Sequence, residues 1–275
     1  LFTLAMLVVI RFGSQLPVPG VNRTYFADWF AAQSNGAFNF FDAFTGGSFM
    51  NMSVFALNIT PYITSSIIMQ LLTIAIPKLE EMQRDGEDGR KKIAEYTRYL
   101  TVALALIESI GMAVGFGGQG LLINYDVWSV IIAVVTMTAG SAFLMWIGER
   151  ITEKGVGNGI SIVLLFNIVS SLPQDVNTLY TRFLSNSKNI GSTVLIVLIM
   201  LAVTAAMVVF VIILQDGERR IPVQYSKKMV GRKLVGGQAS HIPLKVNTAG
   251  VIPVIFASSI MSFPIVIAQF FHPDY

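Results

Sequence analysis

The chain has 275 residues, of which 53% are hydrophobic and only 13% are charged, and its formal net charge is +3. Soluble domains carry about a quarter charged residues, so this chain has too little polar surface to cover a soluble globule. The composition also excludes disordered and coiled-coil proteins, and the complete lack of cysteine excludes a disulfide-framed secreted domain. These numbers predict a membrane protein.

Apolar segments recur along the whole chain, separated by charged or polar loops. A helix of roughly 20 apolar residues crosses the hydrocarbon core of a bilayer. The sequence therefore predicts an all-α fold, a polytopic membrane helix bundle. The first run begins without Met and without a basic region, so we expect no secretory signal peptide. The predicted apolar segments are 1–17, 48–76, 99–116, 128–148, 159–172, 190–214 and 248–271.

Basic residues divide the loops into two groups. The segments 77–98, 149–158 and 215–247 contain all but four of the 19 Lys and Arg residues. Loops rich in Lys and Arg lie on the cytoplasmic side of a membrane. We therefore expect these three loops and the N-terminus to be cytoplasmic.

The stretch 46–76 is too long for one span, yet the charge pattern requires it to cross the membrane once. Asn58 and Pro61 interrupt it, and proline removes a helix N–H. We expect a re-entrant half-helix at about 48–57, followed by a span at 59–76. One long tilted helix with a proline kink is the alternative.

Two further spans are interrupted. The span 159–172 is short and follows a glycine-rich stretch, and the span 248–271 contains Pro253 and Pro264. Irregular backbone at membrane depth is tolerated only inside protein or beside water, and interrupted spans indicate a pathway between helices.

Few side chains suit catalysis. The two histidines, His241 and His272, lie far apart along the chain, and without cysteine there is no ordinary zinc or thiol site. We therefore expect no enzymatic activity, no metal and no cofactor. Glu108 lies in the middle of the span 99–116, where a charge is costly. Two interpretations stay open: it faces a pathway or gate, or a Ser, Thr or Gln of a neighbouring helix satisfies it.

A single arginine near the N-terminus and one long basic loop have separate interpretations. Arg11, near the end of the first apolar run, is expected to reach an interface or to pair locally. In the loop 215–247 charged residues alternate with β-forming residues, as in an extended hairpin. Such a patch suits anionic lipids, an RNA or an acidic protein surface, although ordinary topology signalling would also explain its charge. Its length favours docking.

Several ordered strings spread over the chain resemble the SecY family, whose members form the pore subunit of the bacterial protein-conducting channel. The strings are PVPG at 17–20, FALNITPYI at 55–63, YTRY at 96–99, GVGNGIS at 155–161, RRIPVQY at 219–225, and PLKVN at 243–247 followed by AGVIP at 249–253. Asn58 stands where many relatives have Gly.

The resemblance implies a channel of ten helices in two inverted, pseudo-symmetric halves, of which this chain covers about seven spans. Residues 1–172 would form the first half and residues 190–275 the start of the second. The channel would pass unfolded secretory polypeptides across the membrane and release membrane segments through a lateral gate between the spans 59–76, 99–116 and 248–271.

The resemblance also assigns roles to individual residues. A pore ring of aliphatic side chains would consist of Ile59, Ile63, Ile160, Leu164 and Ile255. A plug, which closes the idle pore from the outer side, would include Gly46, Gly47, Phe49, Met50, Val54 and Phe55. Polar candidates in the lateral gate are Thr64, Ser65, Gln70 and Glu108. Candidate residues for docking are Arg219, Arg220, Lys227, Lys228, Arg232 and Lys233.

The partners implied by the resemblance are the ribosome, the SecA motor ATPase, the subunits SecE and SecG, signal sequences and unfolded export substrates. The implied location is the bacterial cytoplasmic membrane. Two rival functions remain from the residues alone. A secondary transporter of small solutes would need polar groups at the broken helices, and a membrane insertase or scaffold would expose an apolar groove without a pore.

Overall fold

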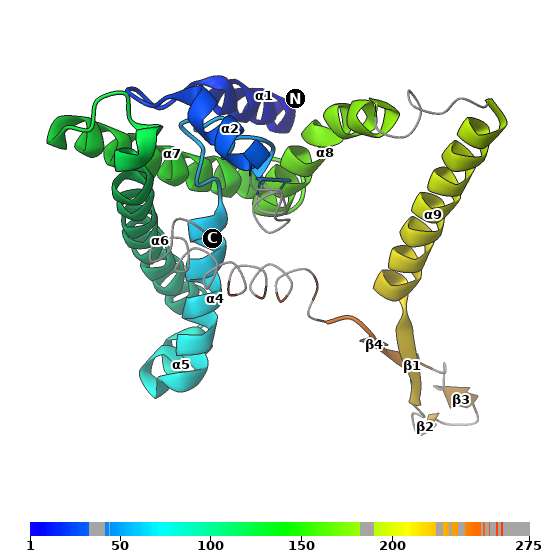
Figure 1. The fold of residues 1–275 in the computed structure, drawn as a ribbon. Helices are drawn as coiled ribbons and strands as arrows, with labels where there is room; N and C mark the ends of the chain where they lie inside the picture. The colour runs from blue at the N-terminus through cyan, green and yellow to red at the C-terminus, as the bar shows by residue number, and fades with distance from the viewer. Residues whose placement is uncertain are drawn as a thin grey trace. The chain divides into compact units, whose positions relative to one another are not determined.

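The structure is a computed structural model, and it describes residues 1–32, 42, 43, 45–181, 190–223, 228–230, 233–235, 240–248, 250, 253, 257 and 260 (Figure 1). The described residues form two compact units. Leu1–Asp175 belongs to the first unit and Val176–Ala257 forms the second.

Helices dominate the first unit. In chain order they are α1 (Phe2–Gln15), α2 (Arg23–Ala32), α4 (Thr60–Ala75), α5 (Pro77–Arg84), α6 (Glu87–Phe116) with a π-helical turn at Gly117–Leu121, α7 (Val127–Lys154), and α8 (Gly159–Leu179), which continues past the boundary of the unit. The predicted span 99–116 is thus the second part of a longer helix. Helix α6 starts well before it because Glu87 and Asp88 complement the positive end of the helix dipole.

Four of the described helices are long and apolar enough to cross a membrane: α6, α7, α8 and α9 (Ile190–Asp216). Helices α4 and α5 pass the same test together but bend by 103° at Ile76, where Pro77 opens α5. Helix α1 is apolar but has only 14 residues. The chain is therefore a multi-pass membrane protein. Most of the predicted span 248–271 lies outside the described residues.

Small residues allow α6 to pack closely against its neighbours. Its buried positions recur every fourth residue and are small: Thr97, Thr101, Ala105, Ser109 and Ala113. Residues four apart lie on one face of a helix, and small side chains let membrane helices approach each other. Helices α4 and α7 both pack against α6.

The segment 46–59 differs from its predicted secondary structure. We expected a half-helix at 48–57, but the structure has a run of turns up to Ile59. Short-range bonds hold these turns, for example from Met52 N to Phe49 O (3.1 Å) and from Ala56 N to Ser53 O (2.9 Å). Positive φ angles at Gly46, Gly47, Met52 and Asn58 explain the difference, because a right-handed helix cannot continue through them.

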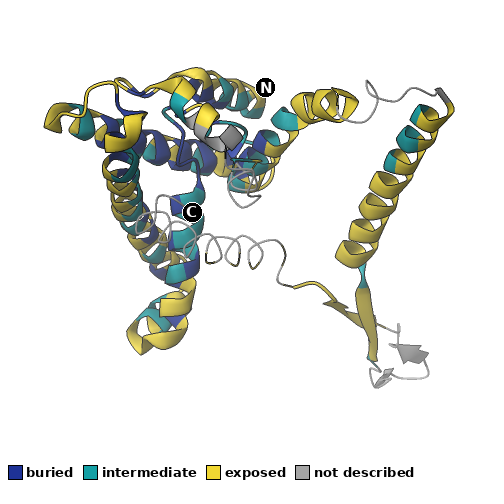
Figure 2. Cartoon of the chain, in the orientation of Figure 1, coloured by how far each residue is buried: buried dark blue, intermediate teal, exposed yellow. Residues whose placement is uncertain are grey.

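Two apolar clusters form the core of the first unit. One contains Phe49, Met52 and Leu57 of the turn segment together with residues of α6, α7 and the loop after α1. The other contains Phe55 and Ile59 with residues of α1, α7 and α8. In Figure 2 the buried positions lie along α7 and at the start of α4. The turn segment contributes to both clusters.

The second unit contains α9 and four strands. Strand β1 (Glu218–Val223) pairs antiparallel with β4 (Ser240–Lys245), and β2 (Lys228–Val230) pairs antiparallel with β3 (Lys233–Val235). The predicted extended hairpin is thus confirmed. Helix α9 is apolar on all sides, and its 18-residue apolar window has no buried residue, as Figure 2 shows. Such a helix is typical of a membrane span.

Candidate functional site

Three of the predicted pore-ring residues meet in one apolar cluster. Ile59 precedes α4 and has no exposed surface, while Ile63 in α4 and Ile160 in α8 are half-buried against the same cluster. The other buried members are Ile10, Phe55, Leu144, Ile147, Ile151 and Val163. Leu164 is half-buried beside Val163, and Ile255 lies outside the described residues. Side chains a hundred positions apart in the sequence therefore pack in one apolar cluster.

The glycine-rich motif before α8 explains how Ile160 reaches this cluster. A Cβ at Gly159 would overlap the carbonyl oxygen of Gly148 in α7, and one at Gly148 would lie 3.2 Å from Cγ1 of Ile160. The start of α8 is fixed by side-chain acceptors: Thr152 Oγ1 accepts the Gly159 N–H (2.9 Å) and Asn158 Oδ1 accepts the Ile160 N–H (3.1 Å). Capping of free N–H groups is typical of helix starts.

Residues 46–58, called the plug segment below, lie in a closely fitted seat. Phe49 and Phe55 are buried, and Gly46, Gly47, Met50 and Val54 are half-buried. Two glycines make room for the segment, because a Cβ at Gly13 of α1 would overlap the Phe55 ring and one at Gly140 of α7 would overlap the carbonyl oxygen of Val54.

Main-chain hydrogen bonds fix the second part of the plug segment. Val18 N donates to Met52 O (3.0 Å), and Val54 N donates to Leu16 O (2.9 Å). The loop after α1 thus pairs with the plug segment in the manner of a short antiparallel bridge.

Asn58 forms the joint between the plug segment and α4. Its φ angle is +52°, its Oδ1 accepts the Ile59 N–H at 2.8 Å, and its carbonyl accepts the Ser141 hydroxyl at 3.0 Å. Asn adopts left-handed backbone more readily than other residues with a side chain. The same conformation suits Gly, which explains how either residue fits this position.

Asp42 and Thr45 hold the entry to the plug segment, and sequence reasoning missed both. Asp42 Oδ1 accepts the Met50 N–H (2.9 Å), and Thr45 Oγ1 accepts the Phe49 N–H (3.3 Å) and donates to Asp42 O (2.9 Å). Burial raises the pKa of the Asp42 carboxyl, although its bonds to Met50 and Thr45 act in the opposite direction. The Asp-x-x-Thr spacing was the available signal.

The predicted gate residues have different surroundings. Ser65 is buried, and its hydroxyl lies 2.5 Å from that of Thr101, so the pair joins α4 to α6. Thr64 donates to Thr60 O (3.0 Å) within its own helix, and Gln70 is exposed. Glu108 is half-buried and has no hydrogen bond to another described residue, so the predicted polar partner on a neighbouring helix is not found there.

A second hydroxyl pair was not predicted from the sequence. Ser109 Oγ lies 2.8 Å from Thr138 Oγ1 and joins α6 to α7. Thr101 and Ser109 both belong to the four-residue repeat of small buried positions on α6. That repeat was the signal that could have identified them.

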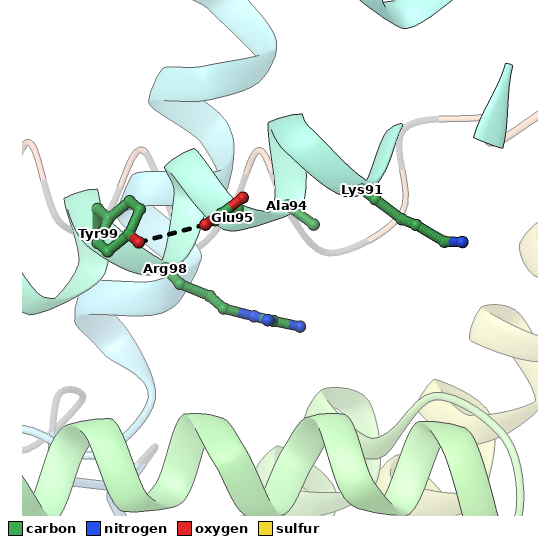
Figure 3. A pocket seen from close by; sticks show the side chains of 5 residues that line it. All are labelled: Lys91, Ala94, Glu95, Arg98 and Tyr99. Carbon is green, nitrogen blue, oxygen red and sulfur yellow. Dashed lines mark hydrogen bonds between the residues drawn. The ribbon is translucent and has the colours of Figure 1, made fainter. Parts of the chain in front are cut away.

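At the charged end of α6, Arg98 joins α6 to α7. Its Nε donates to Glu149 Oε1 at 2.8 Å, and this bond raises the pKa of Arg98. Arg98 also lines a surface hollow of about 450 Å³ with Lys91, Ala94, Glu95 and Tyr99. Figure 3 shows these side chains on one helix, with the Tyr99 hydroxyl donating to Glu95 at 3.2 Å. Within the described residues no cluster of acidic and histidine side chains suits a metal ion.

The predicted docking residues belong to the strand region of the second unit. Arg219 and Arg220 are exposed on β1, opposite Leu244 and Pro243 of β4. Lys228 opens β2 and Lys233 opens β3. Lys227 and Arg232 lie outside the described residues.

Solved structures share this fold. "The structure of a protein conducting channel" matches with a TM-score of 0.62 at 18% identity, over 98% of this chain and 57% of that chain. Sec61 in the canine ribosome–channel complex from the endoplasmic reticulum matches with a TM-score of 0.60 at 18% identity and the same coverage. At these identities the likeness is one of fold alone, that of a helical membrane protein.

Sequence comparison identifies the family. The SecY family model matches residues 53–275. Protein translocase subunit SecY of Halalkalibacterium halodurans is 47% identical over 100% of this chain and 64% of its own length, and that of Escherichia coli K12 is 43% identical over 98% and 61%. The chain belongs to the SecY family. It spans about three-fifths of the length of these curated relatives.

Proposed function

We propose that this chain belongs to the central subunit of a protein-conducting channel in the bacterial cytoplasmic membrane, with its N-terminus in the cytoplasm. The channel passes unfolded secretory polypeptides and releases membrane segments sideways into the lipid. The observation that carries the proposal is the aliphatic cluster in which Ile59, Ile63 and Ile160 meet, directly beside the buried plug segment.

The chemistry of the cluster suits a passive conduit. Branched aliphatic side chains exclude water and ions from a narrow opening by dewetting. They form no hydrogen bond or ion pair that would retain a passing chain, so a polypeptide of any sequence can slide through. A transporter of small solutes would instead need polar groups to recognise its substrate, and the described members of this cluster are apolar.

The parts of the channel follow from this assignment. Residues 1–172 form the first pseudo-symmetric half and residues 190–275 begin the second. The plug segment closes the idle pore from the outer side. Helices α4 and α6, together with the segment 248–271, form the lateral gate, and the Ser65–Thr101 pair holds α4 and α6 together while the gate is shut.

We assign the partners from the charge of the exposed strand region and from the partner of a structural relative. A structural relative is described as Sec61 in a ribosome–channel complex, and exposed arginines such as Arg219 and Arg220 suit contact with ribosomal RNA. We assign the same basic region to SecA and to anionic lipid headgroups. SecE and SecG complete the complex, and signal sequences enter through the gate.

Crosslinking tests the conduit. A photo-reactive side chain replaces Ile63, or separately Ile160, in the full-length protein with its partner subunits, and a secretory precursor is arrested midway through export. Both positions should label the arrested chain, whereas Leu198 on the exposed surface of α9 should not. Export without labelling at either position would contradict the pore assignment.

A further inference from the structure

Arg11 connects three elements that are far apart in the sequence. Its Nη1 donates to the carbonyl oxygen of Gly46 (3.2 Å) and to the hydroxyl of Ser170 in α8 (3.3 Å). This arginine was expected to pair locally or to reach an interface, but its bonds lead to the plug segment and to α8. Among the described residues it has no carboxylate partner, and its guanidinium donates instead to neutral carbonyl and hydroxyl oxygens. An arginine in an apolar helix is costly, which makes this arrangement informative.

Gly46 is closely fitted to the same place. Its φ angle is +64°, and a Cβ there would lie 2.9 Å from Asn167 O and 3.1 Å from Ser170 Oγ. Ser170 Oγ in turn donates to Asn167 O at 2.7 Å. Arg11, Gly46, Asn167 and Ser170 therefore form one polar seat, in which α1 and α8 hold the first residue of the plug segment.

Asn167, whose carbonyl lies against Gly46, also carries an unpaired side-chain donor. Of the buried side-chain nitrogen and oxygen atoms in the described part of the chain, only Nδ2 of Asn167 lacks a hydrogen-bond partner. An unmet buried donor carries a desolvation cost. A residue that borders the seat therefore bears an energetic cost that no hydrogen bond offsets.

We propose that Arg11 is the positioning residue that keeps the first part of the plug segment closed. This inference rests on the proposed function only in that the plug segment closes a conduit. Arg11 holds Gly46 at the start of the first part, where Asp42 and Thr45 also bind Met50 and Phe49, whereas the pairing of Leu16 and Val18 with Met52 and Val54 holds the second part. Loss of Arg11 should therefore loosen the first part, residues 46–51, and leave the second part, residues 52–58, in place.

Thiol labelling can observe this partial release. The residues of this chain include no cysteine, so one introduced cysteine is a unique probe in the full-length complex in detergent once any cysteine in the rest of the subunit and in its partners is replaced. Ser48 is 3% exposed and lies in the first part, and Ser53 is 0% exposed and lies in the second. Asn51 is exposed and serves as the control that reacts in either state.

The expected result is a selective change in the rate of maleimide labelling. Arg11→Gln should raise the rate at Ser48→Cys about tenfold or more, and leave the rates at Ser53→Cys and Asn51→Cys unchanged. Arg11→Lys, which keeps the charge but offers a single donor centre in place of the planar guanidinium, should have a smaller effect. Gly46→Ala should act like Arg11→Gln, because it disturbs the other side of the seat.

Two results would overturn the inference. The first is an unchanged rate at Ser48→Cys in Arg11→Gln. The second is an equal rise at Ser48→Cys and Ser53→Cys, which would mean that Arg11 supports the fold as a whole. Ion conductance after deletion of the plug segment tests the conduit separately, because a channel that stays tight without its plug would refute the proposed function without affecting the labelling result.

Discussion

Gly140 of α7 offers a direct test of how closely the plug segment fits its seat. In Gly140→Ala the new Cβ would overlap the carbonyl oxygen of Val54 and lie 2.9 Å from its carbonyl carbon and Cγ1. These carbon atoms must separate by about 0.5 Å to reach ordinary contact at 3.4 Å, and the oxygen must move further. Overpacking of this kind costs about 1–3 kcal/mol.

The plug segment could instead lift away from α7. If the loop after α1 stays in place, the segment would then lose the two main-chain bonds of Met52 and Val54 to that loop, each contributing about 0.5–1.5 kcal/mol, so either response has a similar cost. Alanine also favours a helix over glycine by up to about 1 kcal/mol, and this gain must be separated from the steric loss.

Gly111 provides the matched control for the gain in helix propensity when glycine is replaced by alanine. It lies inside α6, and no other side chain or distant backbone atom is within 4 Å of where its Cβ would be. Unfolding of the full-length protein by SDS in bicelles should show Gly140→Ala to be about 1–3 kcal/mol less stable than Gly111→Ala. Equal stability of the two variants, together with unchanged labelling at Ser53→Cys, would refute the close fit of plug segment and α7.

Two further predictions concern polar groups. Ser65→Ala and Thr101→Val should show a coupling of about 0.6 kcal/mol in a double-mutant cycle of SDS unfolding, the average for hydrogen bonds between membrane helices; strictly additive effects would argue against the hydroxyl pair. Burial raises the pKa of the Asp42 carboxyl, so the folded protein binds this proton more tightly than the unfolded chain does. The free energy of unfolding should therefore fall as pH rises from the unfolded-state pKa of about 3.9 through the raised folded-state pKa. Asp42→Asn keeps an oxygen for the Met50 N–H and should remove this dependence without loss of stability at pH 7; a wild-type pH profile in the variant would contradict the assignment.

The sequence predicted the elements whose signals are local. Apolar length identified the helices, charge alternation identified the hairpin of β1 and β4, and the glycine-rich motif marked the start of α8. Asn58 and Pro61 correctly indicated a break before α4. The half-helix at 48–57 was not found, because the positive φ angles of Met52 and Asn58 depend on packing that residue type alone does not reveal.

The seat of the plug segment could not be predicted, because it consists of contacts between distant residues. Gly13 and Gly140 are ordinary glycines in apolar helices until Phe55 and Val54 are placed against them. Arg11 likewise carries no local sign of its bond to Gly46. Glu108 illustrates a different case: its depth in a span left a gate role and a polar partner both open, and the hydroxyl pair in this part of α6 is made by its neighbour Ser109.

Phe55 links the plug segment to the proposed pore ring. It belongs to the same apolar cluster as Ile59, and Ile63 and Ile160 pack against that cluster. On the proposed assignment, a plug segment that leaves its seat also withdraws the Phe55 ring from beside these side chains. Burial of a large apolar side chain contributes about 1.5–3 kcal/mol, so the closed plug and the closed ring stabilise each other. On this assignment, we expect a polypeptide that spreads the ring to weaken the seat of the plug as well, so that the two barriers open together.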